Sequence, residues 1–367
     1  MRAVGLGRVV LLAVALAAAP RVLAVSLFAV PDVPADLGGA TRLPWDIVRK
    51  DTPGSWSLAA SVPFPTAVDG LHRMDSGDWL ISVDAPADLG GTTWLPRDVV
   101  RVSGGTYSGF FCGGAVGLAP GVNIDALFLR GGDAGSLVLS FDAPVTIGPV
   151  TYDSADLLAF ARIGPGCSSW MLSGLLFDAS SATPSIAAST NVTGADERGG
   201  NLVLTFDVPT TLGATTHLPG DLVAWDGLSF SMFQSAIAVG WPRGAVVNDF
   251  SFLADPGLVP PTLTVAHGPS FPSDVTLSWS TSCSSGAENY AIYQGTLGSW
   301  YSHTALDCSD DGALLTETVP VGPGNLYYLV VPENTDDEGS YGLNSASTQR
   351  PRGITTCTVT QTISSCP

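Results

Sequence analysis

Asp32-Val-Pro-Ala-Asp-Leu-Gly-Gly-Ala-Thr-Arg-Leu-Pro-Trp-Asp46 is the stretch that decides the fold, because the chain contains its pattern four times. The shared pattern is Asp-x-Pro-x-x-(Leu/Ile)-Gly-x-x-Thr-x-x-x-x-Asp, and its copies cover residues 32–46, 84–98, 142–156 and 207–221. The copies begin about 50 to 65 residues apart, which is the period of a supersecondary unit that repeats and stacks. The pattern therefore predicts a repeat architecture and leaves the chemistry open.

Each repeat also carries apolar segments that are typical of short strands. In the second copy, an alternating run (79–83) precedes the first Asp of the pattern, and another (99–101) follows the last Asp. A third segment (107–111) carries aromatic residues, and a fourth (124–127) joins an apolar residue to an Asp. Four short strands with Gly and Pro turns per repeat are the make-up of a β-propeller blade. Apolar residues on both faces of the strands fit blades that pack between two neighbours.

The two ends of the repeat region predict how the ring closes. The first copy begins at residues 27–30, which already match the second strand of a blade, and the last copy has a surplus segment at 246–252 that resembles a first strand. Strands from both ends would complete one blade and remove the open edge. We therefore expect an all-β fold, a four-bladed β-propeller closed by strands from both ends. A β-sandwich or an open solenoid is the competing architecture, but an open array needs capping repeats, which the sequence does not show.

The third repeat departs from the pattern. Where an apolar-Asp strand is expected, the chain reads Ser185-Ile186-Ala187-Ala188-Ser189, and the polar segment 191–201 follows. We expect a long loop there.

The composition supports an all-β chain. Of the 33 acidic residues, 28 are Asp and 5 are Glu, and Asp prefers turns and caps whereas Glu favours helices. The 42 Gly and 27 Pro residues fit many turns, and no segment after the N-terminus has an apolar period of helical type. Lys and Arg number only 15, and the net charge of −18 argues against nucleic acid as a partner.

The N-terminal residues predict export. Arg2 and Arg8 precede an apolar run at 9–19, and Val22-Leu23-Ala24 offers small residues for signal peptidase, so we expect a signal peptide over residues 1–24. The run is too short for a bilayer of about 30 Å, and no later segment approaches ~18 uninterrupted apolar residues. We expect a secreted protein, extracellular or periplasmic, with no membrane span.

Six Cys residues in an exported chain predict three disulfides. Position along the chain favours the pairs Cys283–Cys308, Cys357–Cys366 and Cys112–Cys167. The sequence has no Cys-x-x-Cys, and its four His residues are isolated, which argues against a zinc site.

The pattern changes after a Pro-containing linker at 257–261, which separates the repeat region (25–256) from residues 262–350 and a Cys-containing tail (351–367). Seven short candidate strands in the second region, among them 300–304 and 341–346, describe an immunoglobulin-like sandwich. Here the chain resembles a fibronectin type III module, over roughly residues 259–350.

Three segments carry this resemblance. Leu277-Ser278-Trp279 is similar to the core-tryptophan strand, Tyr290-Ala291-Ile292-Tyr293 to the strand that follows, and 325–331 to the tyrosine-corner strand, with Tyr328 as the corner residue. The pair Cys283 and Cys308 departs from the disulfide-free pattern of the family and implies a variant of it.

The repeat region resembles hemopexin-like repeats more distantly. Those are also four-bladed and carry Asp-Ala in the innermost strand, as Asp125-Ala126 does here, but they lack the fifteen-residue pattern, so the likeness is an analogy. As a whole the chain looks like secreted bacterial proteins of unassigned role that combine such repeats with such modules.

Two sets of Asp residues are candidates for a metal site. The Asp pair of each pattern (32/46, 84/98, 142/156 and 207/221) brackets a hairpin, where Asp-x-Pro sets the turn and the second Asp caps the return, although a Ca²⁺ ion per blade is the alternative. Asp69, Asp125 and Asp249 belong to the innermost strands. Their carboxylates would crowd the axis and attract a cation, unless each closes a local turn. No cofactor is required, and Ca²⁺ is the possible one.

The position after the repeated Thr is the candidate for ligand binding. It holds Arg42, Trp94, Tyr152 and His217 on an otherwise fixed frame. A constant frame with variable side chains is how repeat scaffolds build binding surfaces, and aromatic rings stack on sugars or peptides. The alternative is that these side chains only shield the hairpins.

Motifs of enzymes are absent: the sequence contains no Gly-x-Ser-x-Gly, no His-Glu-x-x-His and no Gly-rich phosphate loop, so no catalytic residue is assigned. We expect a non-catalytic binding or adhesion protein whose propeller face recognises an extracellular glycan or protein. A carbohydrate-active enzyme, a glycosidase or lyase using Asp carboxylates, is the first alternative. A structural cell-envelope protein is the second. Enzymatic activity as such stays open.

Overall fold

The structure is a computed structural model that describes residues 26–363, except 52–53, 64, 254, 285, 309–313 and 359. The predicted signal peptide (1–24) and Cys366 lie outside these residues. The described chain is all-β, and its helical elements are two short 3₁₀ turns, η1 (Gly113–Val116) and η2 (Ile237–Val239). Within the same residues, no helix is long and apolar enough to cross a membrane.

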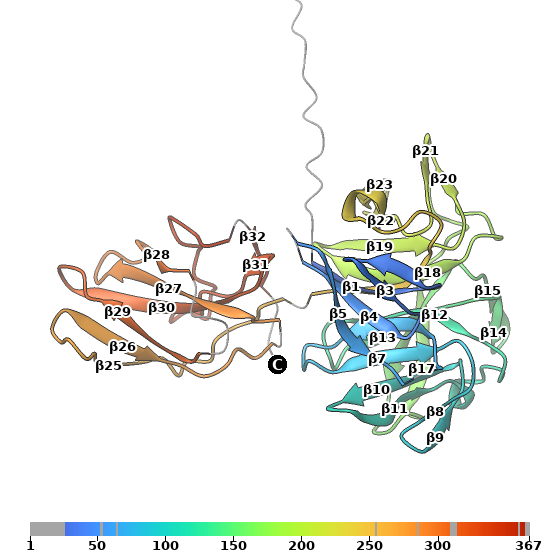
Figure 1. Ribbon diagram of the computed structural model, residues 1–367, viewed down its shortest axis with the longest axis horizontal. Coiled ribbons are helices and arrows are strands. Elements are labelled where there is room, and N and C mark those ends of the chain that lie inside the picture. Colours follow the sequence, from blue (N-terminus) through green and yellow to red (C-terminus); the bar gives the residue numbers. More distant parts are fainter. Residues whose placement is uncertain are drawn as a thin grey trace, which may run out of the picture.

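The repeat region forms four antiparallel sheets of four strands each (Figure 1). From the inner strand outwards they are β24 (Val247–Phe252), β1 (Leu27–Pro31), β4 (Asp46–Lys50) and β5 (Trp56–Ser61); β6 (Val68–Arg73), β7 (Trp79–Val83), β10 (Asp98–Ser103) and β11 (Thr106–Cys112); β12 (Ile124–Arg130), β13 (Ser136–Phe141), β16 (Leu157–Arg162) and β17 (Trp170–Phe177); β18 (Val192–Arg198), β19 (Asn201–Phe206), β22 (Leu222–Trp225) and β23 (Phe230–Gln234).

The inner strands surround a common axis. β6 contacts β12, β12 contacts β18, β18 contacts β24, and β24 contacts β6, so the cycle is closed. Buried apolar clusters fill the spaces between successive sheets; Phe111, Leu139 and Phe160, for example, belong to one cluster that joins two sheets. The apolar residues on both faces of the strands are thus explained by packing against two neighbours, and the arrangement is that of a β-propeller.

The predicted pairing of the two ends of the repeat region is confirmed. β24 pairs antiparallel with β1, with Phe28 opposite Ser251 and Val30 opposite Asp249, and it takes the innermost place in the sheet β24-β1-β4-β5. The surplus segment after the last repeat therefore supplies the strand that the first repeat lacks, and the edge of β1 is covered.

The expected long loop is confirmed over residues 185–191, which form no strand, but it is wrong beyond them, because β18 (Val192–Arg198) is a buried innermost strand. Its polar and small residues have partners inside the ring: the Thr193 hydroxyl donates to the Val247 carbonyl (2.9 Å), and the Asp196 carboxylate accepts the Phe252 N–H (2.9 Å). A Cβ on Gly194 would lie 2.9 Å from the Asp249 carboxylate, so this position has no room for a side chain. Small and hydrogen-bonded residues replace apolar ones here because the inner strands approach closely.

Each copy of the fifteen-residue pattern forms a small hairpin between the second and third strands of its sheet. The hairpins are β2 (Ala35–Leu37) with β3 (Ala40–Arg42), β8 (Ala87–Leu89) with β9 (Thr92–Trp94), β14 (Val145–Ile147) with β15 (Val150–Tyr152), and β20 (Thr210–Leu212) with β21 (Thr215–His217). Gly38 and its counterpart Gly90 have φ of 65°, which the tight turn requires and which other residues rarely adopt.

Residues after the linker form two further sheets. One contains β25 (Thr264–His267), β26 (Asp274–Ser278) and β29 (Thr316–Pro320); the other contains β28 (Thr304–Asp307), β27 (Asn289–Thr296), β30 (Leu326–Glu333), β31 (Asp337–Glu338) and β32 (Thr360–Gln361). Trp279 packs in the cluster between them. The expected strand at 300–304 is wrong, since β28 begins only at Thr304, and the expected strand at 341–346 is reduced to an isolated bridge at Leu343.

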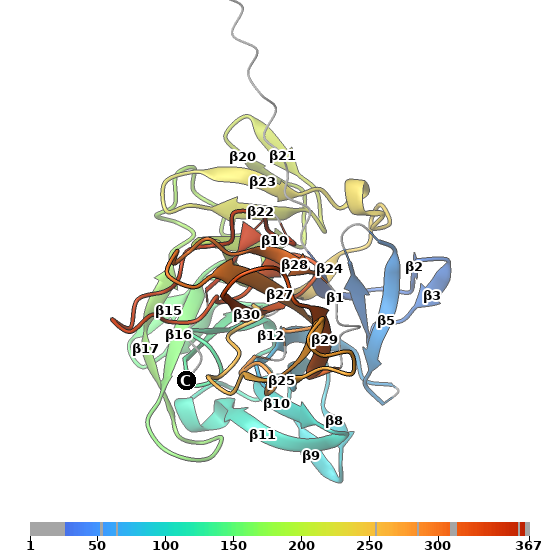
Figure 2. The ribbon, with the colours of Figure 1, turned by 90° about the vertical axis from the view of Figure 1, so that its left-hand side faces the viewer.

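These two sheets lie at the end of the propeller axis that is remote from the hairpins (Figures 1 and 2). The Asp336 carboxylate accepts the Ser26 N–H (2.8 Å), Arg198 forms an ion pair with Asp337, and Arg49 forms one with Glu288 (2.5 Å). The hairpin end of the axis is consequently left uncovered by the described C-terminal residues.

The disulfides follow the prediction only in part. Cys112–Cys167 is confirmed and joins two successive sheets at their outer edges. The predicted Cys283–Cys308 and Cys357–Cys366 pairs are wrong, because Cys308 is bonded to Cys357, which ties β28 to the C-terminal segment. Cys283 is also disulfide-bonded, and its partner is not Cys308.

Candidate functional site

The second Asp of each pattern closes a turn and holds the next segment. The Asp98 carboxylate accepts the Leu95 N–H (3.2 Å) with one oxygen and the Gly113 N–H (2.9 Å) with the other. The corresponding bonds of Asp221 go to Leu218 (2.8 Å) and Ala236 (2.8 Å). Both oxygens are used by the backbone, as expected for a capping role.

The first Asp of the pattern fixes the start of an inner strand. Asp32 accepts the Val246 N–H (2.8 Å), Asp142 the Asn123 N–H (3.1 Å), and Asp207 the Asn191 N–H (2.9 Å). The repeated pair therefore links the hairpin to the inner strand on one side and to the outer segment on the other. These contacts explain the pattern without a metal ion.

Asp249 lies at the centre of the ring and is completely buried. Its carboxylate accepts four backbone N–H groups, one from each inner strand: Leu71 (2.7 Å), Leu127 (3.0 Å), Ala195 (3.2 Å) and Phe250 (2.8 Å). Burial raises the pKa of Asp249, and the four N–H donors oppose that shift by favouring the charged form. Asp249 therefore links all four sheets through hydrogen bonds to their inner strands.

Asp69 and Asp125 lie nearer the hairpin end of the axis, in a network with three Asn side chains. The Asn123 amide donates to Asp69 (2.6 Å) and to Asp125 (3.1 Å), Asn248 donates to Asp69 (3.1 Å), and Asn191 donates to Asp125. Burial raises the pKa of Asp69 to about 6 and that of Asp125 to about 8, and neighbouring Asp carboxylates add to both shifts. Both groups therefore titrate in or near the physiological range.

The structure does not bring the three predicted metal ligands into one cluster. Within its own sheet Asp249 holds the position that Gly70 and Ala126 hold in theirs, one residue beyond Asp69 and Asp125, and both its oxygens are occupied by N–H groups. Among the described residues, the one group of three ligand atoms within 4.8 Å is Glu333, Glu338 and Cys357, and the Cys357 sulfur is already in a disulfide.

The four residues predicted to bind a ligand point toward the sheets. His217 is only 2% exposed, and Arg42, Trp94 and Tyr152 are half-buried. Trp94 and Tyr152 pack against the apolar clusters of their sheets. The exposed face of each hairpin instead carries the cross-strand pairs Asp36/Thr41, Asp88/Thr93, Thr146/Thr151 and Thr211/Thr216. The ligand-binding role of the first set stays a prediction.

A polar hollow of about 400 Å³ opens at the other end of the axis, next to the C-terminal sheets. His72, Asp196, Arg198 and Asp255 line it, together with Thr362 from the C-terminal segment. Burial lowers the pKa of His72 to about 4 and raises those of Asp196 to about 7 and Asp255 to about 6. Because Arg198 contacts Asp255 (3.6 Å) and Asp337, the hollow belongs to the contact between the two parts of the chain.

Aromatic side chains surround a second hollow, of about 460 Å³, in the C-terminal sheets. We call it the aromatic hollow; its lining is Trp300, Tyr301, Tyr327, Tyr328, Leu329, Asn344, Ser345 and Arg350. Trp300 is 65% exposed and Tyr301 is 43% exposed. This site is not predicted from the sequence, because residues 300–304 are expected to form a strand. The turn signal at Leu297-Gly298-Ser299, just before them, was the available indication.

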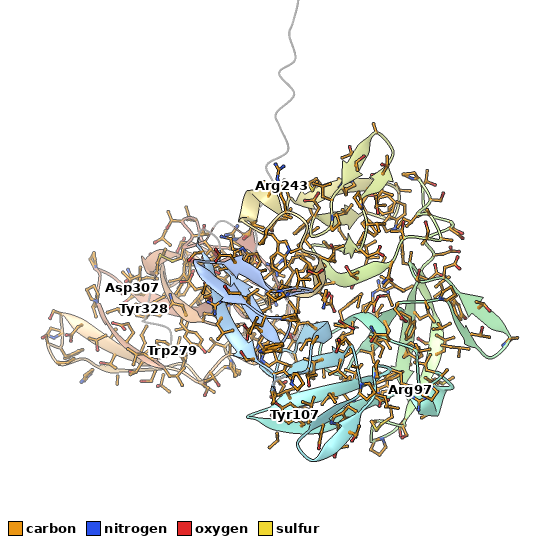
Figure 3. All side chains as sticks on the ribbon, turned by 45° about the vertical axis from the view of Figure 1, so that its right-hand side comes forward. Arg97, Tyr107, Arg243, Trp279, Asp307 and Tyr328 are labelled. Carbon is orange, nitrogen blue, oxygen red and sulfur yellow. A yellow bond between two sulfur atoms is a disulfide. The ribbon has the colours of Figure 1, made fainter. Side chains whose placement is uncertain are left out.

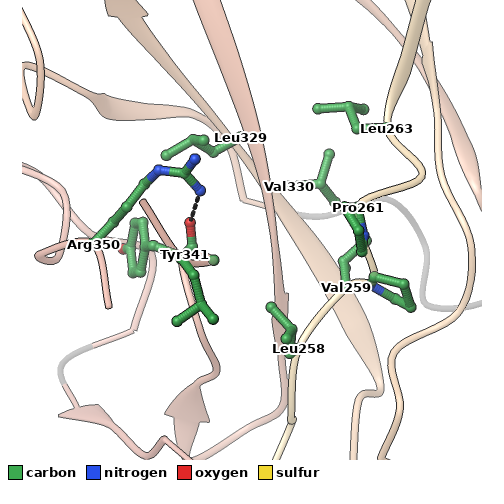
Figure 4. A pocket seen from close by; sticks show the side chains of 11 residues that line it. Leu258, Val259, Pro261, Leu263, Leu329, Val330, Tyr341 and Arg350 are labelled. Carbon is green, nitrogen blue, oxygen red and sulfur yellow. Dashed lines mark hydrogen bonds between the residues drawn. The ribbon is translucent and has the colours of Figure 1, made fainter. Parts of the chain in front are cut away.

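Tyr328, which Figure 3 labels beside Trp279 in the C-terminal sheets, does not behave as the predicted corner residue. Its buried hydroxyl has no hydrogen-bond partner among the described residues, and burial raises its pKa. Leu329 and Arg350 also line a smaller apolar hollow of about 270 Å³ on the adjoining side, where an Arg350 guanidinium N–H donates to the Tyr341 carbonyl at 3.1 Å (Figure 4). This bond fixes the position of the guanidinium between the two hollows.

No family model and no curated protein matches the chain by sequence. Among solved structures, it is similar to virginiamycin B lyase from Staphylococcus aureus (TM-score 0.24, 11% identity, 80% of this chain and 69% of that one). It is also similar to YCF48 bound to D1 peptide (0.26, 9%, 66% and 57%) and to PorZ, a surface component of the type-IX secretion system of Porphyromonas gingivalis (0.28, 10%, 83% and 49%). Likenesses at this level carry no functional argument.

Proposed function

We propose that the protein is a secreted, non-catalytic binding or adhesion protein, in which a four-bladed β-propeller carries a fibronectin type III-like module and the ligand is an extracellular glycan or protein. The observation that carries the proposal is the hairpin face. Four equivalent hairpins project from the end of the axis opposite the C-terminal sheets, and each presents an exposed cross-strand pair. Two pairs are Asp/Thr and two are Thr/Thr, so a constant frame displays a variable polar pattern.

The use of the Asp carboxylates supports a role without turnover. A carboxylate-pair enzyme needs one acid and one base free to face the substrate. Here Asp98 and Asp221 bind backbone N–H groups through both oxygens, and Asp249 binds four. Carboxylates held in this way position the fold and are not free to transfer protons.

Secretion and the lack of a required cofactor are part of the same proposal. Disulfides persist in extracellular and periplasmic environments, and Cys112–Cys167 and Cys308–Cys357 suit either one. A Ca²⁺ ion is optional and its place would be Asp69 and Asp125 at the hairpin end of the axis. Melting curves in EDTA and in millimolar calcium decide this point, because an ion that binds only the folded state raises the melting temperature once its free concentration exceeds its dissociation constant.

A carbohydrate-active enzyme is the second candidate, and the observation that favours it is the separated pKa values of Asp69 (about 6) and Asp125 (about 8). The test is an array of glycans and extracellular-matrix proteins, followed by product analysis of every ligand that binds. Binding without cleavage supports the proposal. Cleavage that Asp125→Asn abolishes would establish the enzyme instead. If no ligand binds at all, both the binding protein and the carbohydrate-active enzyme are contradicted.

A further inference from the structure

We propose that the aromatic hollow binds a neutral saccharide through stacking of a pyranose ring on Trp300 and Tyr301. The inference rests on the proposed function, which it deepens by naming a ligand class and a second binding surface, separate from the hairpin face. The hollow lies between the turn that joins β27 to β28, the first half of β30 and the segment after β31. Its volume of about 460 Å³ is in the range of small-ligand sites.

Two aromatic rings of the hollow are exposed. Trp300 and Tyr301 are adjacent in sequence, both exposed, and Trp300 lies 5.7 Å from Tyr327 with the ring planes inclined by 40°. Singly exposed apolar side chains are common on protein surfaces, whereas several exposed aromatic rings gathered around one hollow are typical of a ligand site. One face of a pyranose ring presents C–H groups, which match an aromatic face, and its hydroxyl groups require polar partners at the rim.

Hydrogen bonds hold the rings of the hollow in place before any ligand arrives. The Pro351 carbonyl can only accept a hydrogen bond, so His303 donates to it from Nε2 (3.0 Å) and its Nδ1 accepts the Tyr327 hydroxyl (3.1 Å). His303 is completely buried, and its pKa is lowered by that burial, so it keeps this neutral form. The orientation of Tyr327 is consequently fixed.

Tyr301 is held from the other side of the hollow. The Asn344 amide donates to the Tyr301 hydroxyl (3.2 Å), while its carbonyl oxygen accepts the N–H groups of Ala346 (2.9 Å) and Thr348 (3.0 Å). The backbone of Tyr301 has φ of 67°, a left-handed conformation that is unfavourable for a bulky residue. Strain of this kind is typical of functional sites, and a rigid site loses less entropy on binding.

The charge and shape of the hollow define the class of its ligand. Among the described residues of the lining, Arg350 is the one that is charged, and its guanidinium already donates to Tyr341. The protein carries a net charge of −18, which repels acidic glycans. Asn344, Ser345 and the tyrosine hydroxyls offer neutral donors and acceptors, as saccharide hydroxyls require. A proline-rich peptide also stacks on aromatic rings, but it needs an extended groove, whereas this site is a compact hollow.

The test uses the whole secreted chain and a set of neutral oligosaccharides: cellohexaose, xylohexaose, maltohexaose and chitohexaose. Calorimetry of the wild type identifies which of them binds. Trp300→Ala and Tyr301→Ala should each weaken that binding by about tenfold or more, because each removes a stacking surface. The matched control is Phe271→Ala, which removes a ring of similar exposure (53%) from the turn before β26 and should leave the affinity unchanged.

The outcomes separate this inference from the proposed function. If the wild type binds an oligosaccharide and neither Trp300→Ala nor Tyr301→Ala weakens it, the hollow is not the site, although a binding function stands. If a proline-rich peptide or an acidic glycan binds at the hollow in place of the four neutral oligosaccharides, the ligand class is wrong. If the wild type binds none of these ligands and nothing on the broader array, the proposed function fails as well. Unchanged melting temperatures of the variants show that loss of binding is local.

Discussion

Replacing Asp249 by Asn tests whether a charged carboxylate holds the four sheets together. The two oxygens of Asp249 each accept two backbone N–H groups from the inner strands, at 2.7 to 3.2 Å. An Asn side chain has the same shape, but its NH₂ group cannot accept a hydrogen bond, so two buried N–H groups lose their partner. Each unsatisfied buried donor costs about 1 to 3 kcal/mol, which predicts a loss of about 2 to 6 kcal/mol.

Thermal unfolding followed by calorimetry measures this loss. At roughly 2 to 4 °C per kcal/mol for a domain of this size, Asp249→Asn should lower the melting temperature on the order of 10 °C. Asp36→Asn, on the exposed face of a hairpin, is the matched control and should melt like the wild type. If Asp249→Asn melts within about 1 °C of the wild type, the carboxyl group is already protonated or dispensable. This result would refute the idea that a charged carboxylate links the four sheets.

Four further experiments address other parts of the structure. Deleting residues 246–253 removes β24 and exposes the edge of β1, so the protein should unfold or aggregate; a monomer with unchanged melting contradicts the closure. Cys308→Ser opens a loop of 49 residues and should destabilise the protein by about 4 kcal/mol, as measured by denaturant unfolding. An unchanged denaturation midpoint would show that this disulfide does not stabilise the fold. Tyr301→Gly relieves the left-handed strain, so it should raise stability by about 1 kcal/mol while it abolishes saccharide binding; lowered stability would show that φ is not strained. Because the folded-state pKa of Asp125 is raised to about 8, its contribution to stability is present below the unfolded value near 4 and is lost as the pH rises to about 8. Melting temperatures from pH 4 to 8 should therefore fall less steeply in Asp125→Asn, and parallel curves contradict the shift.

The repeat and its closure could be predicted from the sequence because they depend on local patterns. The spacing of the fifteen-residue pattern marks each hairpin, and the apolar runs on either side of it mark the strands. The surplus segment 246–252 resembles an inner strand closely enough to be assigned to the first sheet, as β24 confirms. Local turn chemistry and strand periodicity were sufficient for this level.

The innermost strand of the third sheet was not predicted, because buried strands are usually rich in large apolar residues and this one is not. Val192-Thr193-Gly194-Ala195 has little apolar surface, and it reads as a loop when considered alone. Near the axis, however, small residues are required, and polar groups are satisfied by neighbouring strands. The available signal was that Val192 stands at the same place in its repeat as Val68 and Ile124, each of which pairs with the last residue of its second strand.

The orientation of the hairpin side chains could have been derived from periodicity alone. Neighbouring residues of a strand point to opposite faces, so an exposed Thr41 requires that Arg42 face the sheet. The buried Leu37, on the same face as Arg42, gives the same answer. Disulfide connectivity, in contrast, depends on which segments meet in space, and six Cys residues allow many pairings. The aromatic hollow is equally non-local, since its rings come from separate segments.

Polar bridges between neighbouring sheets complete the ring that Asp249 joins at its centre. The first residue of every inner strand accepts a side-chain donor through its carbonyl: Val68 from Asn248 (3.1 Å), Ile124 from Ser82 (2.9 Å), Val192 from Ser140 (2.7 Å) and Val247 from Thr193 (2.9 Å). The donor differs between repeats, but the acceptor position is constant. Inner strands of different sheets share no ladder, so their axial backbone groups need side-chain partners. The closed ring is therefore specified by polar residues at its axis as well as by apolar packing between the sheets.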